Sequence, residues 1–208
     1  MTYVPEIQVD AAYYRTRSYD TKKRFSSYWN QINLVMNEQP RRCLEIGIGN
    51  GFVSSYLRQR GLSVITCDFD PALKPSVAGN VLQLPFRDRT FDVVLCAEVL
   101  GHLPFEHFSE ALGEIARVST AKVVLSLLHR GACISVGLTV PRLIDFHITR
   151  QVPFRRPTPV EIPSHYWEIG APDWPESRIH ATFTRFFRIE RQFRVVENPF
   201  HHFYLLAR

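Results

Sequence analysis

The chain has 208 residues, of which 45% are hydrophobic and 22% are charged, a composition that fits one globular domain with a substantial core. No apolar run approaches the roughly 20 residues of a membrane-spanning helix, and residues 1–10 contain acids but no apolar segment, so we expect neither a spanning helix nor a signal peptide. These exclusions favour the cytoplasm as the location.

The net charge of +5 is concentrated near the two ends of the sequence. Residues 1–42 and 181–208 each carry +3, residues 130–180 carry +1, and residues 43–129 carry −2. Basic ends would suit an anionic substrate or a nucleic acid, although ordinary solvated faces of a helix end and a strand are the favoured interpretation. The four cysteines form no C-x-x-C pair, so neither a disulfide nor a metal site is expected.

The first predicted element is an N-terminal helical segment, residues 1–40. Its first half is polar and rich in tyrosine, and we expect it to be irregular. Asp20 or Thr21 would cap a helix that runs to about Asn37, because apolar side chains recur there at helical spacing.

A buried strand then leads into the glycine turn Gly47-Ile48-Gly49-Asn50-Gly51, which is followed by a predicted helix over 52–60 and a strand over 62–68. Glycines let the backbone approach a ligand where a Cβ would collide, and the helix N-terminus favours negative or polar ligand groups. Asp68 ends the second strand, where nucleoside-binding α/β domains place the acid that binds the ribose hydroxyls. A dinucleotide fingerprint would need its third glycine at Phe52, and no Gly-Lys-Ser/Thr of a P-loop follows.

The rest of the sequence up to residue 129 continues the alternation of strands and helices. Prolines shorten the next connection, and the following elements are predicted as a brief strand over 76–79, a strand over 91–97, a helix over 104–118 and a strand over 121–128. Two final strands, 187–196 and 201–207, are joined by a tight turn. This order predicts an α/β fold with a three-layer, doubly wound, Rossmann-like sheet of about seven strands, mostly parallel with an antiparallel strand near the C-terminus.

Residues 1–208 are expected to form one domain, in which 41–129 is the ligand-binding core and 183–208 supplies the final strands. Residues 130–182 are rich in proline and aromatic side chains and break the strand–helix rhythm. We therefore expect them to cap the carboxyl ends of the strands, where ligands bind. Four consecutive side chains in this cap are candidates for substrate contact, or for an aromatic lid held by packing: His165, Tyr166, Trp167 and Glu168.

Five short patterns follow one another across residues 43–128. Glu45 stands two residues before the first of the three glycines, which gives the pattern E-x-G-x-G-x-G. The four later patterns are Cys67–Pro71, Gly79–Phe86, Phe91–Leu103 and Glu114–Val118. In this order they resemble the motifs of the class I S-adenosylmethionine-dependent methyltransferases of the small-molecule type, often called methyltransferase type 11.

The resemblance implies a methyltransferase that binds S-adenosylmethionine. It assigns cofactor binding to Glu45, Gly47, Ile48, Gly49, Gly51, Asp68, Phe69, Asn80, Val81, Leu82, Ala97 and Glu98. Asp68 would accept hydrogen bonds from both ribose hydroxyls, whereas Phe69 would pack on the adenine or belong to the core. Asn80 stands where the family usually has Asp, and its side-chain oxygen can still accept from the adenine amine.

Methyl transfer from a sulfonium is an in-line displacement that depends largely on holding donor and acceptor at attack distance. An oxygen or ring-nitrogen acceptor also needs a base, and Glu98, His102 and His129 follow strand ends where a base would act. His102 could instead be a packed, hydrogen-bonded histidine. His201-His202 is expected in a solvated turn, and residues 13–15 would close over the cofactor carboxylate.

Other functions fit the sequence less well. A nucleic-acid (RNA) methyltransferase would fit the basic ends, but there is no N/D-P-P-Y/F motif and no dense patch of basic and aromatic side chains. Phe52 disfavours a NAD(P)-dependent oxidoreductase. A non-catalytic S-adenosylmethionine-binding scaffold stays open because of Asn80, as does a lipid or isoprenoid acceptor at a membrane surface, although no amphipathic basic helix demands one. The expected partner is a small-molecule acceptor, without integral membrane association; its identity and the oligomeric state do not follow from the sequence.

Overall fold

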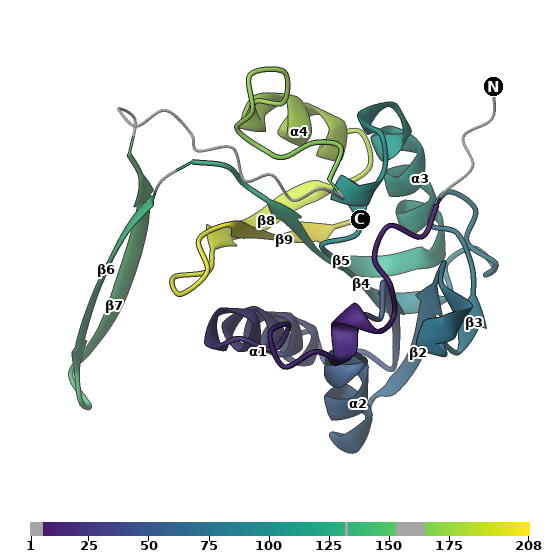
Figure 1. The fold of residues 1–208 in the computed structure, drawn as a ribbon, viewed down its shortest axis with the longest axis horizontal. Coiled ribbons are helices and arrows are strands. Elements are labelled where there is room, and N and C mark those ends of the chain that lie inside the picture. The colour runs from purple at the N-terminus through teal and green to yellow at the C-terminus, as the bar shows by residue number, and fades with distance from the viewer. Residues whose placement is uncertain (1–5, 132, 153–164) are drawn as a thin grey trace.

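The computed structural model describes residues 6–131, 133–152 and 165–208. Its centre is a seven-stranded sheet in the order β3-β2-β1-β4-β5-β9-β8 (Figure 1). The strands are β1 (Arg42–Ile46), β2 (Ser63–Asp68), β3 (Val77–Ala78), β4 (Phe91–Ala97), β5 (Ser119–Leu128), β8 (Arg188–Arg194) and β9 (His201–Ala207). Strands β1 to β5 pair in parallel, whereas β9 is antiparallel to both of its neighbours. The predicted sheet, mostly parallel with an antiparallel strand near the C-terminus, is confirmed.

Helices cover both faces of this sheet and complete the three layers. Helices α1 (Lys22–Asn37) and α2 (Phe52–Gln59) pack on one face, while α3 (Phe108–Val118) and α4 (Glu176–Phe183) pack on the other. Successive residues of a strand point to opposite faces, so Cys43 packs with α1 and α2 whereas Leu44 packs with α3 and α4. Because both faces are covered, the central strands are apolar on both sides.

Local signals set the helix boundaries. The Thr21 hydroxyl accepts a hydrogen bond from the Arg24 backbone N–H at 3.3 Å and caps the start of α1. The helix expected from Pro104 begins later, because Phe105–His107 forms a 3₁₀ turn and the α-helix starts only at Phe108. None of the helices in the described ranges is both long enough and apolar enough to cross a membrane.

The segment expected to cap the strand ends divides into several parts. Strands β6 (Cys133–Val140) and β7 (Ile144–Gln151) form a hairpin that extends away from the body of the molecule (Figure 1), so this part does not act as the expected cap. Residues 165–171 do lie against the strand ends, next to the end of β5. Residues 153–164 lie outside the described residues. The alternation of apolar and polar residues along the hairpin is the strand signal that an interpretation based on proline and aromatic content overlooked.

Candidate functional site

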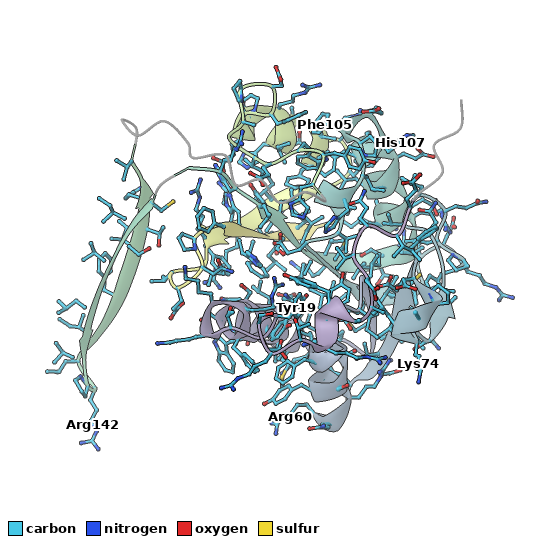
Figure 2. All side chains as sticks on the ribbon, in the orientation of Figure 1. Tyr19, Arg60, Lys74, Phe105, His107 and Arg142 are labelled. Carbon is cyan, nitrogen blue, oxygen red and sulfur yellow. The ribbon has the colours of Figure 1, made fainter. Side chains whose placement is uncertain are left out.

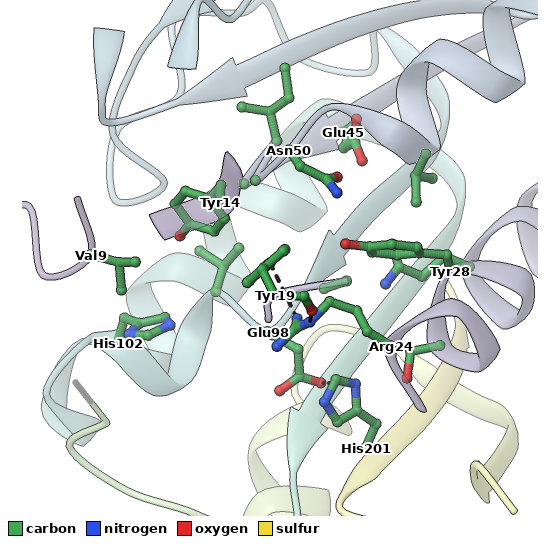
Figure 3. Close-up of a pocket in the computed structure, with 18 of the residues that line it drawn as sticks. Val9, Tyr14, Tyr19, Arg24, Tyr28, Glu45, Asn50, Glu98, His102 and His201 are labelled. Atoms are coloured by element: carbon green, nitrogen blue, oxygen red, sulfur yellow. Dashed lines mark hydrogen bonds and ion pairs between the residues drawn. The ribbon is translucent and has the colours of Figure 1, made fainter. Parts of the chain in front are cut away.

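A cavity of about 480 Å³ opens at the carboxyl ends of β1, β2 and β4 (Figure 3). The loops that follow these strands form one side of it, and α1 with the residues before it forms the other. The described residues that line it are Val9, Tyr13, Tyr14, Tyr19, Arg24, Ser27, Tyr28, Gln31, Glu45, Gly47, Ile48, Gly49, Asn50, Val53, Asp68, Ala97, Glu98, Val99, His102, Leu128, His165 and His201.

The glycine loop between β1 and α2 passes close to its neighbours. Gly47 has a φ of 79°, and a Cβ added there would lie 2.2 Å from Val99 Cγ2. Gly49 has a φ of 53°, and the Tyr19 hydroxyl lies 3.5 Å from the position of its Cβ. Only glycine fits position 47, because both the backbone conformation and the space exclude a side chain.

Asp68 stands at the end of β2, beside the glycine loop. One carboxylate oxygen accepts a hydrogen bond from the Ile48 N–H at 2.8 Å, and the other accepts from the Asp70 N–H at 2.9 Å. Burial raises the pKa of Asp68 above its usual value, while these two backbone bonds favour the charged form. The carboxylate is therefore held in a fixed orientation on the cavity wall.

Glu45 is a buried carboxyl group on β1, only 3% exposed. Its Oε2 has no hydrogen-bond partner among the described residues. Burial raises its pKa to about 7, against the opposing effect of a hydrogen bond with Ser54. A cationic ligand group placed in the cavity would restore the charged form.

A smaller hollow of about 110 Å³ adjoins the cavity on the β2–β3 side. Asp68, Phe69, Asn80 and Val81 are among its described lining residues. The Asn80 side-chain oxygen already accepts from the Leu82 N–H at 2.9 Å, which leaves one lone pair for a ligand. Leu82 itself packs against the apolar core, away from the position expected for it.

The side of the cavity after β4 and β9 is polar. Glu98, whose φ of 57° is unusual for a side-chain-bearing residue, accepts from the Ser126 hydroxyl at 2.7 Å, and His201 Nδ1 lies 3.5 Å from the same oxygen (Figure 3). His102 Nε2 lies 3.1 Å from His165 Nε2. Burial lowers the pKa of His165 to about 3, so this ring is neutral at neutral pH. Of the three proposed bases, Glu98 and His102 lie here together.

His129, the third proposed base, is placed elsewhere. It is buried, its Nδ1 lies 2.9 Å from His202 Nδ1, and it lines an adjoining hollow of about 210 Å³ that shares Arg24, Leu128 and His201 with the large cavity. His201 and His202 are not in a solvated turn as expected, since they are 6% and 5% exposed. The reason is their pairing with Leu128 and Leu127 of β5, which draws both into the sheet.

The four candidate substrate residues after 164 do not form one surface. His165 lines the large cavity, whereas Tyr166 is 48% exposed. Trp167 packs in the core and donates to Leu103 O at 3.0 Å. Glu168 lines the adjoining hollow that His129 also lines. Only His165 is therefore in position to contact a ligand in the large cavity.

Helix α1 supplies cavity residues that the sequence interpretation missed. Arg24 donates from Nε to Tyr19 O at 3.1 Å and from Nη1 to the Tyr19 hydroxyl at 3.2 Å. Arg24 forms no ion pair with a described residue. Arg24, and not the expected Arg15, is the cation that lines the cavity. Ser27 and Gln31 could have indicated that this helix lines a cavity, because two polar residues one turn apart fall on its buried face.

Comparison with known proteins agrees with this geometry. Residues 44–126 match the family model described as a methyltransferase domain. An uncharacterized protein of Methanocaldococcus jannaschii is 28% identical over 117 residues, which are 51% of this chain and 51% of that protein. Demethylmenaquinone methyltransferase of Thermus thermophilus is 30% identical over 123 residues, 48% of this chain and 55% of that protein. The chain spans about half the length of these curated relatives.

Solved structures share the fold. The 1,6-didemethyltoxoflavin-N1-methyltransferase of Burkholderia thailandensis, with S-adenosylhomocysteine bound, has a TM-score of 0.63 at 15% identity, covering 93% of this chain and 81% of that chain. The magnesium protoporphyrin IX methyltransferase of Synechocystis, also with S-adenosylhomocysteine, has a TM-score of 0.62 at 17% identity, covering 98% and 90%. The core of the chain, residues 44–126, therefore matches the methyltransferase-domain family, and the chain shares the fold of these two methyltransferases.

Proposed function

We propose that the protein transfers the methyl group of S-adenosylmethionine to a small-molecule acceptor. The observation that carries this proposal is the position of Asp68 beside the glycine loop, on the wall of a large cavity. Its carboxylate keeps free lone pairs for the ribose diol of the cofactor, and charge-assisted bonds of this kind are the strong ones. The buried, unpartnered Glu45 then fits the ammonium group of the methionine half.

The remaining cofactor contacts follow from the same placement. Arg24 would bind the cofactor carboxylate from α1, on the opposite wall from Glu45. Phe69, Asn80 and Val81 would surround the adenine in the smaller hollow. These roles all assume that Asp68 binds the ribose.

A small acceptor is supported by the size of the cavity and by the relatives. The cavity has the volume of a small-molecule site rather than the open, basic groove of a nucleic-acid-binding protein. The similar proteins are named for demethylmenaquinone, 1,6-didemethyltoxoflavin and magnesium protoporphyrin IX. No described feature favours RNA over such an acceptor.

Glu98 and His102 would serve the acceptor. When bound, S-adenosylmethionine would supply an electrophilic methyl carbon that an acceptor oxygen or nitrogen can attack in line, with the thioether as the leaving group. Glu98, next to the methyl position implied for residues after β4, would take the acceptor proton, with His201 3.5 Å from the same carboxylate. His165 would orient the acceptor through Nδ1, which has no partner among the described residues, while His102, held by Gln8 at Nδ1, fixes the His165 ring through Nε2.

Calorimetric titration with S-adenosylmethionine, S-adenosylhomocysteine and, as a control, NAD tests the proposal. The wild-type protein is expected to bind the first two and not NAD. Asp68→Ala should weaken binding by at least about 100-fold, because two hydrogen bonds to a charged group are lost at about 1.5–3 kcal/mol each. Gly49→Val should abolish binding. Asp173→Ala, which removes an exposed carboxylate away from the cavity, serves as the control for loss of charge. Tight binding by folded Asp68→Ala and Gly49→Val would show that the site is misassigned.

A further inference from the structure

The hairpin β6–β7 stands away from the body of the molecule (Figures 1 and 2). Within the described residues its two strands pair only with each other, so both long edges carry unpaired backbone groups. A two-stranded hairpin is marginally stable in water unless one of its faces is packed against something. The hairpin therefore has a face that a partner would stabilise.

One face of the hairpin is apolar. Directly opposed residues share a face, and three successive pairs are Val136–Ile148, Leu138–Phe146 and Val140–Ile144. Leu138 is 54% exposed and Phe146 is 53% exposed. Leu143 in the turn is 81% exposed. An exposed apolar surface of this length marks an interaction site in a water-soluble fold.

The opposite face connects the hairpin to the body. The Ser135 hydroxyl lies 2.9 Å from the Thr149 hydroxyl and donates to Val196 O at 3.3 Å. The Arg194 guanidinium donates to Cys133 Sγ. Because these hairpin residues alternate with the apolar ones, the apolar face points away from the body.

The charges that accompany this face are positive. Arg150 pairs with Ile134 at one end, Arg142 occupies the tip (Figure 2), and no acidic residue belongs to the same alternating set. A second copy of the chain packed on this face would bring more arginines and no carboxylate to pair with them. An anionic lipid surface offers acyl chains to the apolar residues and phosphates to the arginines, whose stems can lie along the apolar groups.

We propose that the hairpin is a peripheral membrane-binding element that lays its apolar face on an anionic lipid bilayer. Its unpaired edges limit the depth of insertion, because backbone groups without partners are not tolerated in the hydrocarbon region. The hairpin therefore lies at the boundary of headgroups and acyl chains, in the plane of the membrane. Each strand has 8 residues, which at about 3.4 Å per residue gives an extended contact of about 27 Å.

Flotation with lipid vesicles tests this inference on the purified full chain. Wild-type protein is expected to bind vesicles of phosphatidylcholine and phosphatidylglycerol at least tenfold better than vesicles of phosphatidylcholine alone. Leu138→Asp should lose at least tenfold of this binding, and Arg142→Glu should lose the preference for phosphatidylglycerol. Trp29→Asp is the matched control, because it makes the same charge change at a side chain that is 62% exposed on α1. Its binding should equal that of the wild type.

Three results would overturn the inference: no vesicle binding by the wild type, equal binding by Leu138→Asp, or a wild-type dimer that Leu138→Asp dissociates while vesicles go unbound. The last would assign the face to a second copy. Phe146→Ser, which removes apolar area without adding charge, is a second variant and should weaken binding severalfold. Circular dichroism and the thermal midpoint should stay close to those of the wild type, because the hairpin strands pair only with each other in the described structure.

Discussion

Four buried polar atoms around the cavity have no hydrogen-bond partner among the described residues: Glu45 Oε2, Glu98 Oε2, His165 Nδ1 and His201 Nδ1. Leaving a buried polar group unpaired costs about 1–3 kcal/mol, so folded proteins rarely do it. Their gathering around one cavity indicates that a ligand supplies the missing bonds. This agrees with a site that binds a polar cofactor and a polar acceptor side by side.

Gly47 and Gly61 provide a matched test of the close approach at the glycine loop. Both have a positive φ, 79° and 89°, but a Cβ meets Val99 only at Gly47 and open space at Gly61. Gly61→Ala should cost about 1–2 kcal/mol from the left-handed backbone alone. Gly47→Ala should cost roughly 1–3 kcal/mol more from overpacking, and should weaken S-adenosylhomocysteine binding. Urea unfolding and calorimetry measure the two effects, and equal costs at both positions would contradict the close approach.

Residues of the cofactor half could be predicted individually, because their positions follow from local geometry. Glu45, the glycine loop and Asp68 occupy the end of one strand, the next turn and the end of the next strand. Leu82 could not be placed correctly, since a residue two positions from Asn80 can face either the hollow or the core. Its direction depends on the loop conformation, which no periodic pattern specifies.

At the scale of elements, one arginine at the end of α3 holds the loop that carries Asn80. Arg117 donates from Nη1 to Phe86 O at 2.8 Å, from Nη2 to Leu84 O at 2.9 Å and from Nε to Glu114 at 2.7 Å. This explains the arginine of the Glu114–Val118 pattern: a planar guanidinium spreads five N–H donors over three nitrogens in a fixed plane, whereas an ammonium has three donors on a single nitrogen.

Arg117→Lys is therefore expected to lower the free energy of unfolding by about 2 kcal/mol, in the range of hydrogen bonds to charged groups. It should also weaken S-adenosylhomocysteine binding severalfold, because the loop reaches the adenine hollow. Arg41→Lys, at an exposed arginine, controls for the substitution itself. An unchanged urea midpoint in Arg117→Lys would mean that the loop holds its shape without this residue.

Elements with strong periodicity were predicted nearly to the residue, and the hairpin and α4 were not. The helix at 22–37 and the strands of the parallel core repeat apolar residues at the spacing of their own structure. In residues 130–182 the interpretation gave more weight to the frequent prolines than to the alternation of apolar and polar residues over 133–151. The apolar face of this hairpin packs on no other element among the described residues. No pattern elsewhere in the sequence therefore supported a strand assignment here.

At the scale of the whole molecule, buried histidines link stability to pH. Burial lowers the pKa of His129, His165 and His202 to about 3, from an ordinary value of 6.5. The unfolded chain therefore takes up protons first as the pH falls. The stability from these groups is fully present above about pH 6.5 and is lost as the pH falls toward 3. Near pH 5 the loss is on the order of 2 kcal/mol for each histidine.

Urea unfolding over a series from about pH 7.5 to about pH 4.5 should show this loss. His165→Gln removes one titrating group and should reduce the slope of the unfolding free energy against pH. Glu45→Gln should steepen it, because a carboxyl group whose pKa is raised to about 7 stabilises the folded state more as the pH falls toward 4.5. Stability that stays constant between about pH 6.5 and about pH 4.5 in the wild type would rule out buried neutral histidines.

The sequence by itself determined the class of fold and the close placement of the residues proposed to hold the cofactor. Glu45, Gly47, Gly49 and Asp68 lie within one strand–turn–helix–strand unit, whose geometry follows from local periodicity and a right-handed crossover. Their places could be predicted because few conformations connect elements so close in sequence.

Only the tertiary structure decided the rest of the cavity. Arg24, Glu98, His165 and His201 come from four distant segments of the chain and meet at one cavity. What brings them together is the packing of α1 on the sheet and the antiparallel pairing of β9 with β5. The register of that pairing decides whether His201 faces a cavity or solvent, because a shift of one residue sends a strand side chain to the opposite face. No local pattern encodes such a register.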